Sequence, residues 1–148
     1  PDTNGTVDIY VRDLEATAVA TAYGSSCRGT SPFAPQAEGI GQPFLGNGNF
    51  AVGVCEGFPQ QAAILAMSLA PASISYGLCD VLLGGSVIGL PTSFTNIAGF
   101  ASTPCPIPAI PSFAGLTLYA QYAVFDPNGR FLGFAALSQG LAITLDLP

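Results

Sequence analysis

Nonpolar and polar residues alternate along much of this 148-residue chain, most clearly between residues 116 and 125. Within that stretch, Leu116, Leu118, Ala120, Tyr122 and Val124 fall on one face of an extended segment. A period of two is the pattern of a β-strand that has one face in a hydrophobic core. The stretch therefore predicts a long strand around which the other elements are organised.

The four residues that follow, from Asp126 to Gly129, have the composition of a β-turn. Asp suits the first position of a type I turn, Pro the second and Gly the fourth. Asp126, Asn128 and Gly129 also match part of a calcium-binding loop, but the remaining ligand positions are missing. We therefore interpret this segment as a turn that leads into further strands.

The same alternation, bounded by Gly, Pro, Ser and Asn, predicts nine or ten short strands in all. They cover residues 6–12, 16–23, 49–55, 61–70, 78–83, 86–90, 93–101, 116–125, 131–137 and 141–145. Residues 61–70 are also compatible with a helix, since short apolar runs are ambiguous by periodicity alone. The pattern indicates an all-β fold, a single β-sandwich or jelly-roll-like domain.

Two segments interrupt the strand pattern. Residues 27–48 show no periodicity and are expected to form either a disulfide-anchored binding loop or a long crossover at one end of the sandwich. Residues 103–111 contain four prolines, and a central strand cannot hold so many residues that lack a backbone donor. This second segment is expected at a sheet edge, where it would also discourage unwanted strand pairing.

The first strand stands apart from the rest of the pattern. Val7, Ile9 and Val11 form its nonpolar face, and a short polar kink separates it from residue 16 onward. We therefore divide the chain into an N-terminal extension, residues 1–15, and a β-sandwich domain, residues 16–148. Asn4 begins an N-glycosylation sequon, although Asn-Gly is also a common turn dipeptide.

Charge is scarce, which excludes several classes of function. Only 8% of residues are charged, the three cations are all arginines, and the net charge is −6. Such a chain cannot neutralise a run of phosphates, so nucleic acid is not an expected partner. Neither His nor Lys is present to serve a nucleophilic triad, and the acids lie mostly at predicted turns or strand ends. We expect neither an enzyme nor a cofactor.

The sequence points to a location outside the cell. No apolar run is long enough to cross a membrane, and the chain begins at Pro1 with no signal peptide, as expected of a processed form. The four cysteines are widely spaced and no His accompanies them, which favours two disulfides over a zinc site. Of three possible pairings we favour Cys27–Cys79 with Cys55–Cys105, each closing a loop of about 50 residues.

Several phrases of the chain resemble a known family: residues 23–27 (YGSSC), 77–81 (GLCDV), 113–129 and 138–145. Together they look like the C-terminal module of large secreted proteins from planctomycete-type bacteria, over residues 22–147. The resemblance implies a β-sandwich and supports the Cys27–Cys79 pairing, because those two cysteines recur in the family. It implies little about activity. Residues 4–13 instead resemble the closing strand of a propeller blade, here without its blade.

These observations favour a structural subunit of an extracellular filament or surface appendage. In this reading, residues 6–12 add to the sheet of a neighbouring copy, with Val7, Ile9 and Val11 filling its groove, and the contact repeats into a homopolymer. The alternative is a secreted module that binds carbohydrate or the cell envelope. That alternative is supported by the loop at residues 28–48, by the family resemblance, and by an aromatic platform that the five tyrosines would build, namely Tyr10, Tyr23, Tyr76, Tyr119 and Tyr122.

Overall fold

The computed structural model describes residues 18–148, and the predicted strand at 6–12 lies outside this range. The described part contains no α-helix, so the all-β prediction is confirmed and residues 61–70 form a strand. It has twelve strands and one 3₁₀ turn: β1 (Val19–Tyr23), β2 (Gln36–Ile40), β3 (Ala51–Cys55), β4 (Ala62–Ser68), β5 (Ala70–Tyr76), β6 (Cys79–Gly84), β7 (Ile88–Gly89), β8 (Ser93–Phe94), β9 (Ala101–Pro104), η1 (Pro111–Phe113), β10 (Thr117–Phe125), β11 (Ala135–Leu137) and β12 (Gly140–Thr144).

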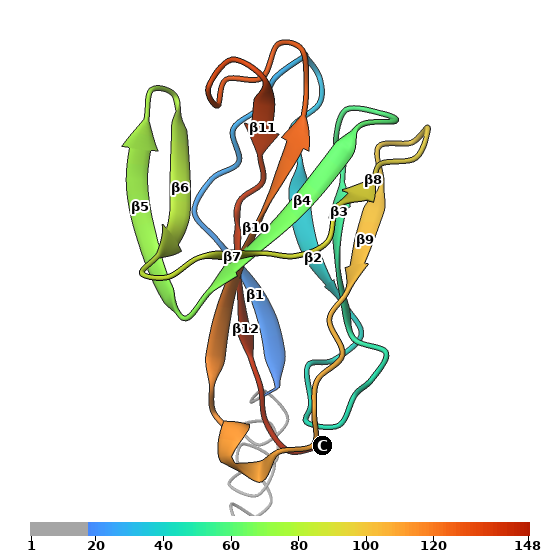
Figure 1. The fold of residues 1–148 in the computed structure, drawn as a ribbon, viewed down its shortest axis with the longest axis vertical. Helices are drawn as coiled ribbons and strands as arrows, with labels where there is room; N and C mark the ends of the chain where they lie inside the picture. The colour runs from blue at the N-terminus through green and yellow to red at the C-terminus, as the bar shows by residue number, and fades with distance from the viewer. Residues whose placement is uncertain (1–17) are drawn as a thin grey trace, which may run out of the picture.

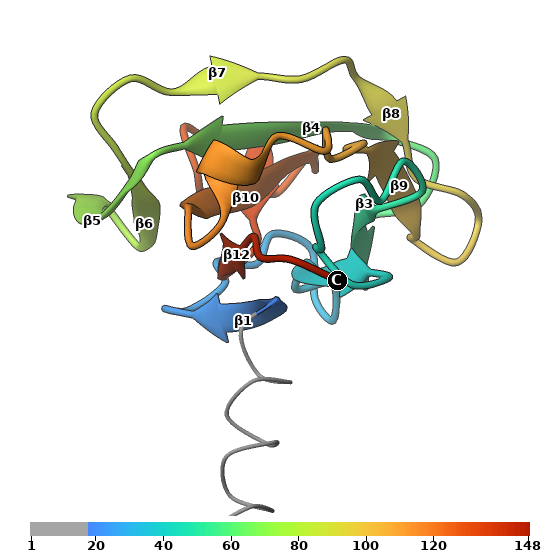
Figure 2. The same cartoon turned by 90° about the horizontal axis from the view of Figure 1, so that it is seen from below.

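The strands form three antiparallel sheets. The central sheet has the order β1-β12-β10-β4-β7, with β11 added to β10 and β8 added to β4. The second sheet has the order β2-β3-β9, and β5 and β6 form a separate hairpin. Figures 1 and 2 show the hairpin on one side of the central sheet and β2, β3 and β9 on the other. The long strand β10 therefore lies in the middle of a sandwich-like domain.

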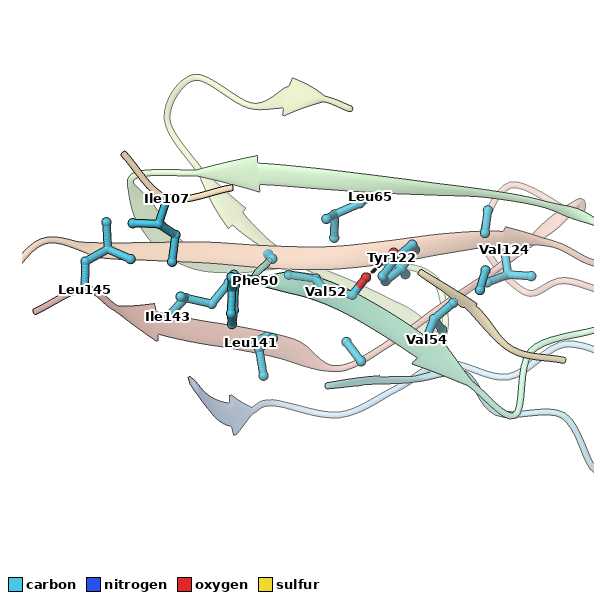
Figure 3. Packing of buried hydrophobic residues seen from close by; sticks show 14 of the residues in the cluster. Phe50, Val52, Val54, Leu65, Ile107, Tyr122, Val124, Leu141, Ile143 and Leu145 are labelled. Atoms are coloured by element: carbon cyan, nitrogen blue, oxygen red, sulfur yellow. Dashed lines mark hydrogen bonds between the residues drawn. The ribbon is translucent and has the colours of Figure 1, made fainter. Parts of the chain in front are cut away.

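The main core fills the space between the central sheet and β3, as Figure 3 shows. Ala120, Tyr122 and Val124 of β10 are fully buried there, which confirms the nonpolar face predicted for this strand. The Tyr122 hydroxyl donates to the Val52 carbonyl at 2.7 Å and lies 2.7 Å from the Thr103 hydroxyl. Burial raises the pKa of Tyr122 to about 12, so this phenol stays neutral and holds the two sheets together.

Two buried glutamines join the outer strands to the centre. Gln121 points away from the main core, where its amide donates to the carbonyls of Asp80 and Ser138 and accepts from the Leu82 N–H, at 2.8–3.0 Å. Gln139 does the same for β2, exchanging two hydrogen bonds with the backbone of Ala37. Neither β6 nor β2 pairs its backbone with the central sheet, so these side chains satisfy edge groups that would otherwise be buried unpaired.

Several strand predictions need correction. The structure shortens residues 86–90 to β7 and residues 131–137 to β11, and it splits residues 93–101 into β8 and the start of β9. The split occurs because the Asn96 carboxamide oxygen accepts from the N–H groups of Ala98 and Phe100, which closes a local turn. Residues 27–48, predicted to lack regular structure, contain β2, and the exposed strand β5 was not predicted.

The predicted turn after β10 is confirmed. The Gly129 N–H donates to the Asp126 carbonyl at 2.9 Å, and the Asp126 carboxylate accepts from the Asn128 N–H at 2.9 Å. That carboxylate is buried and also accepts from the backbone N–H of Thr30 at 2.8 Å. A side chain at Gly129 would overlap the backbone of Ala135, so glycine is required here by space. Asp126 thus anchors a distant loop.

Candidate functional site: an apolar groove at one end of the sandwich

The residues that the structure describes cover the hydrophobic face of the central sheet only in part. On β4, Ala63 and Leu65 are fully buried, Met67 is half-buried, and Leu69 just beyond the strand is 69% exposed. On β10, burial falls in the same direction, from Tyr122 at 0% to the half-buried Leu118. The second sheet causes this gradient, because β3 and β9 are only five and four residues long and end before the central strands do.

The uncovered part of the face forms a groove of about 550 Å³, the size of a typical ligand pocket. Its lining comes from the end of β4, the segment after β7, the proline-rich wall formed by residues 104–108, η1, the residue before β3, and strands β10 and β12 with their flanking residues. All fourteen lining residues are nonpolar: Met67, Leu69, Leu90, Pro104, Cys105, Pro106, Ile107, Pro108, Phe50, Phe113, Leu116, Leu118, Ile143 and Leu145. A neighbouring hollow of about 370 Å³ shares Met67, Leu69 and Leu118.

The proline-rich wall is a sheet edge, as the sequence predicted. β9 is the last strand of its sheet, and the N–H groups of Cys105 and Ile107 donate inward to the carbonyls of Phe50 and Asn47, at 2.9 and 3.0 Å. In an extended chain the intervening residues face the other way, and residues 104, 106 and 108 are all prolines. The outer edge of this segment therefore carries carbonyl acceptors, and its prolines supply no donors.

The cysteine predictions divide into one that is confirmed and one that is wrong. Cys27 and Cys79 form a disulfide, with their Cα atoms 5.2 Å apart. Cys55 and Cys105 are both free. Cys105 lies opposite Phe50, whereas Cys55 lies five residues further along β3, about 16 Å away at ~3.3 Å per residue. A disulfide requires Cα atoms within roughly 7 Å, so one strand pair keeps these thiols apart.

The two free thiols differ in what holds them neutral. Burial raises the pKa of Cys105, which lines the groove. Burial also raises the pKa of Cys55, and the carboxylates of Glu38 and Glu56 raise it further by disfavouring the thiolate. Both thiols are therefore slow nucleophiles at neutral pH.

Salt should separate these two causes. We expect higher ionic strength at a fixed pH near 9 to speed alkylation of Cys55 relative to Cys105, on the order of twofold, because salt screens carboxylate repulsion but not burial. The measurement is quantitative mass spectrometry after N-ethylmaleimide treatment of the folded chain. Glu38→Gln should produce the same change without added salt. An unchanged ratio in both experiments would show that the carboxylates do not act on Cys55.

The remaining site predictions are not gathered at one place. Tyr122 is in the core, Tyr23 packs edge-on against Tyr119 with ring centres 5.8 Å apart, and Tyr76 packs against Phe131. Within residues 18–148, the tyrosines therefore form no shared platform. Asn4, Val7, Ile9, Val11 and Tyr10 lie outside the described residues.

No group of His, Cys, Asp and Glu among the described residues is arranged to hold a metal ion. In particular, the Asp126 carboxylate is occupied by N–H groups of the turn and of Thr30. The described part of the chain also contains no helix long and apolar enough to span a membrane.

Sequence reasoning did not identify the groove. The feature of the sequence that best indicates the groove is the proline at every second position from 104 to 108, because it marks an unpaired strand edge. The mismatch in length between the two sheets has no local signal. Comparisons with protein-family models, with curated proteins and with solved structures give no match for this chain. What the fold defines is a disulfide-containing, all-β sandwich-like domain with an open apolar groove.

Proposed function

We propose that this protein is a structural subunit of an extracellular filament or surface appendage, whose copies assemble when residues 6–12 of one copy bind to the next. The observation that carries the proposal is the uncovered hydrophobic face at the end of the central sheet. The chain itself supplies a segment with the pattern needed to cover such a face, since Val7, Ile9 and Val11 alternate with polar residues.

The surface also supports assembly. Seven large nonpolar side chains in the described part expose 60% or more of their area: Leu69, Leu78, Ile88, Phe94, Ile97, Leu132 and Leu147. With only 8% charged residues, little on the surface opposes association. A contact between a strand of one copy and a groove of the next joins two different surfaces, so it repeats into an open polymer. The Cys27–Cys79 disulfide suits an oxidising, extracellular setting.

Electron microscopy of the purified full-length chain tests the proposal. We expect regular fibres by negative stain, and we expect Ile9→Asp to abolish them, because a carboxylate cannot enter an apolar groove without a large desolvation cost. Asp8→Ser, on the polar face of the same segment, should leave the fibres intact. Discrete particles from the unmodified chain, or fibres that survive Ile9→Asp, would overturn the proposal. Discrete particles would direct attention to the envelope-binding alternative.

A further inference from the structure

We propose that the apolar groove is the acceptor site, and that residues 6–12 of a second copy lie extended in it along residues 104–108. This inference rests on the proposed function and identifies the surface that receives the donated strand. The described part of the chain has other free sheet edges, including the outer edges of β1 and β5, so the choice of the groove needs an argument of its own.

Side-chain chemistry favours the groove. Every lining residue is nonpolar, so the groove gains little from a polar occupant and much from a nonpolar one. β5 offers a poorer surface, because five of its seven residues are exposed and it stands away from the main core. An occupant with nonpolar side chains on one face only, such as residues 6–12, would cover Met67, Leu69 and Leu118 while keeping its charges in water.

Length and backbone chemistry agree with this placement. Residues 104–108 line the groove, and the five residues 7–11, which carry Val7, Ile9 and Val11, can lie extended beside them. The carbonyls of residues 104 and 106 lie on the open edge of this segment, because Cys105 and Ile107 bond to Phe50 and Asn47 on the other side. Since Pro104 and Pro106 have no N–H, hydrogen bonds run mainly one way, from the incoming strand to the edge. Specificity then depends on the side chains, which the alternation of Val7, Ile9 and Val11 supplies.

The test uses two full-length variants, each damaged on one side of the contact. Ile9→Asp spoils the donated segment and leaves the groove intact. Leu69→Asp places a charge on the groove wall, and it should not disturb folding because Leu69 is 69% exposed. A thermal melt checks the fold of both variants. Leu78→Asp, at a leucine that is 76% exposed and does not line the groove, is the matched control.

We expect each variant alone to stay monomeric and the control to form filaments like the unmodified chain. A mixture of Ile9→Asp and Leu69→Asp should form 1:1 dimers and nothing larger, measured by analytical ultracentrifugation. In such a dimer, the intact segment of the Leu69→Asp copy fills the intact groove of the Ile9→Asp copy, and neither copy can continue the chain. The absence of dimers would overturn the inference.

Cys105 reports directly on the groove because it lines it, and Cys55 is the internal control. Assembly should slow alkylation of Cys105 at least tenfold while changing that of Cys55 little.

Two results would show that the groove is not the acceptor. One is filament formation by Leu69→Asp, and the other is a Cys105 that is equally reactive in filaments and in the Ile9→Asp monomer. Both results leave strand donation standing, whereas fibres formed by Ile9→Asp remove the proposed function itself. Shielded Cys105 in isolated unmodified monomers would mean that the segment fills its own groove, which also overturns the inference.

Discussion

Replacing Cys27 and Cys79 together with serine should lower the free energy of unfolding by about 4 kcal/mol. The disulfide spans 52 residues, and in the chain-entropy model a loop of that size restricts the unfolded chain strongly. It also lies in a small second core with Leu137, between the β5–β6 hairpin and the central sheet. The Cys27 backbone exchanges hydrogen bonds of 2.7 and 2.9 Å with Leu137 of β11. The disulfide therefore fixes the β5–β6 hairpin to a segment that is itself paired with the central sheet.

Equilibrium unfolding in guanidinium chloride, followed by circular dichroism, gives the free energy directly. Cys55→Ser is the control, since it removes a thiol that forms no disulfide, and it should cost less than about 1 kcal/mol. Equal losses in the two variants would mean that the disulfide does not stabilise the fold. Hydrogen exchange adds a local measure, because the β5–β6 hairpin should lose protection before the main core does.

The elements that sequence predicted correctly are those determined by their own residues. β10 alternates over nine residues, and the turn at Asp126 has the right residue at each position, so local chemistry was sufficient. The prolines after β9 likewise marked an edge, because proline has no backbone donor wherever it occurs. Residues 61–70 were ambiguous by pattern, and pairing with β10 over six residues decides for the strand β4.

The elements that sequence missed depend on distant partners. β2 is held by β3 and by the side chain of Gln139, about a hundred residues away in the chain. β5 is exposed along most of its length. Because neither of its faces lies in a core, its nonpolar and polar residues need not alternate, and the sequence shows no strand pattern there. Residues 93–101 alternate as a strand would, but the side chain of Asn96 satisfies two N–H groups locally and turns the chain.

The candidate site also has one part that local sequence determines and one part that depends on distant residues. The segment proposed as the donor can be recognised in the sequence, because its nonpolar residues alternate with polar ones. Its proposed acceptor is invisible there, since the groove exists only because β3 and β9 are shorter than the strands they cover. The predicted Cys55–Cys105 pairing was wrong for a related reason. The two cysteines lie at opposite ends of the β3–β9 strand pair, and their spacing along the chain does not reveal this.

Replacing Gln121 with leucine should cost about 4 kcal/mol of unfolding free energy, although leucine has a similar size. Gln121 is 4% exposed, and its amide is the partner of the Leu82 N–H and of the Asp80 and Ser138 carbonyls. Leucine would leave these buried groups without that partner, and each such loss costs roughly 1–3 kcal/mol. The alternating pattern alone would place Gln121 on a solvent-facing position, where the same substitution would hardly change the free energy of unfolding.

A comparison with Gln42→Leu shows whether Gln121 behaves as a buried hydrogen-bonding partner or as a solvent-facing residue. Gln42 is exposed, so its replacement should change the free energy of unfolding by less than about 0.5 kcal/mol. Equal effects in the two variants would mean that water replaces the lost amide and that the hairpin does not depend on Gln121. Exchange of the Leu82 amide hydrogen gives the site-specific answer, because its protection should fall in Gln121→Leu while that of Val52 in the main core is retained. Such a result would establish that the Gln121 side chain, rather than strand pairing, joins the β5–β6 hairpin to the central sheet, alongside the Cys27–Cys79 disulfide and the hydrogen bond from the Tyr23 hydroxyl to the Leu82 carbonyl.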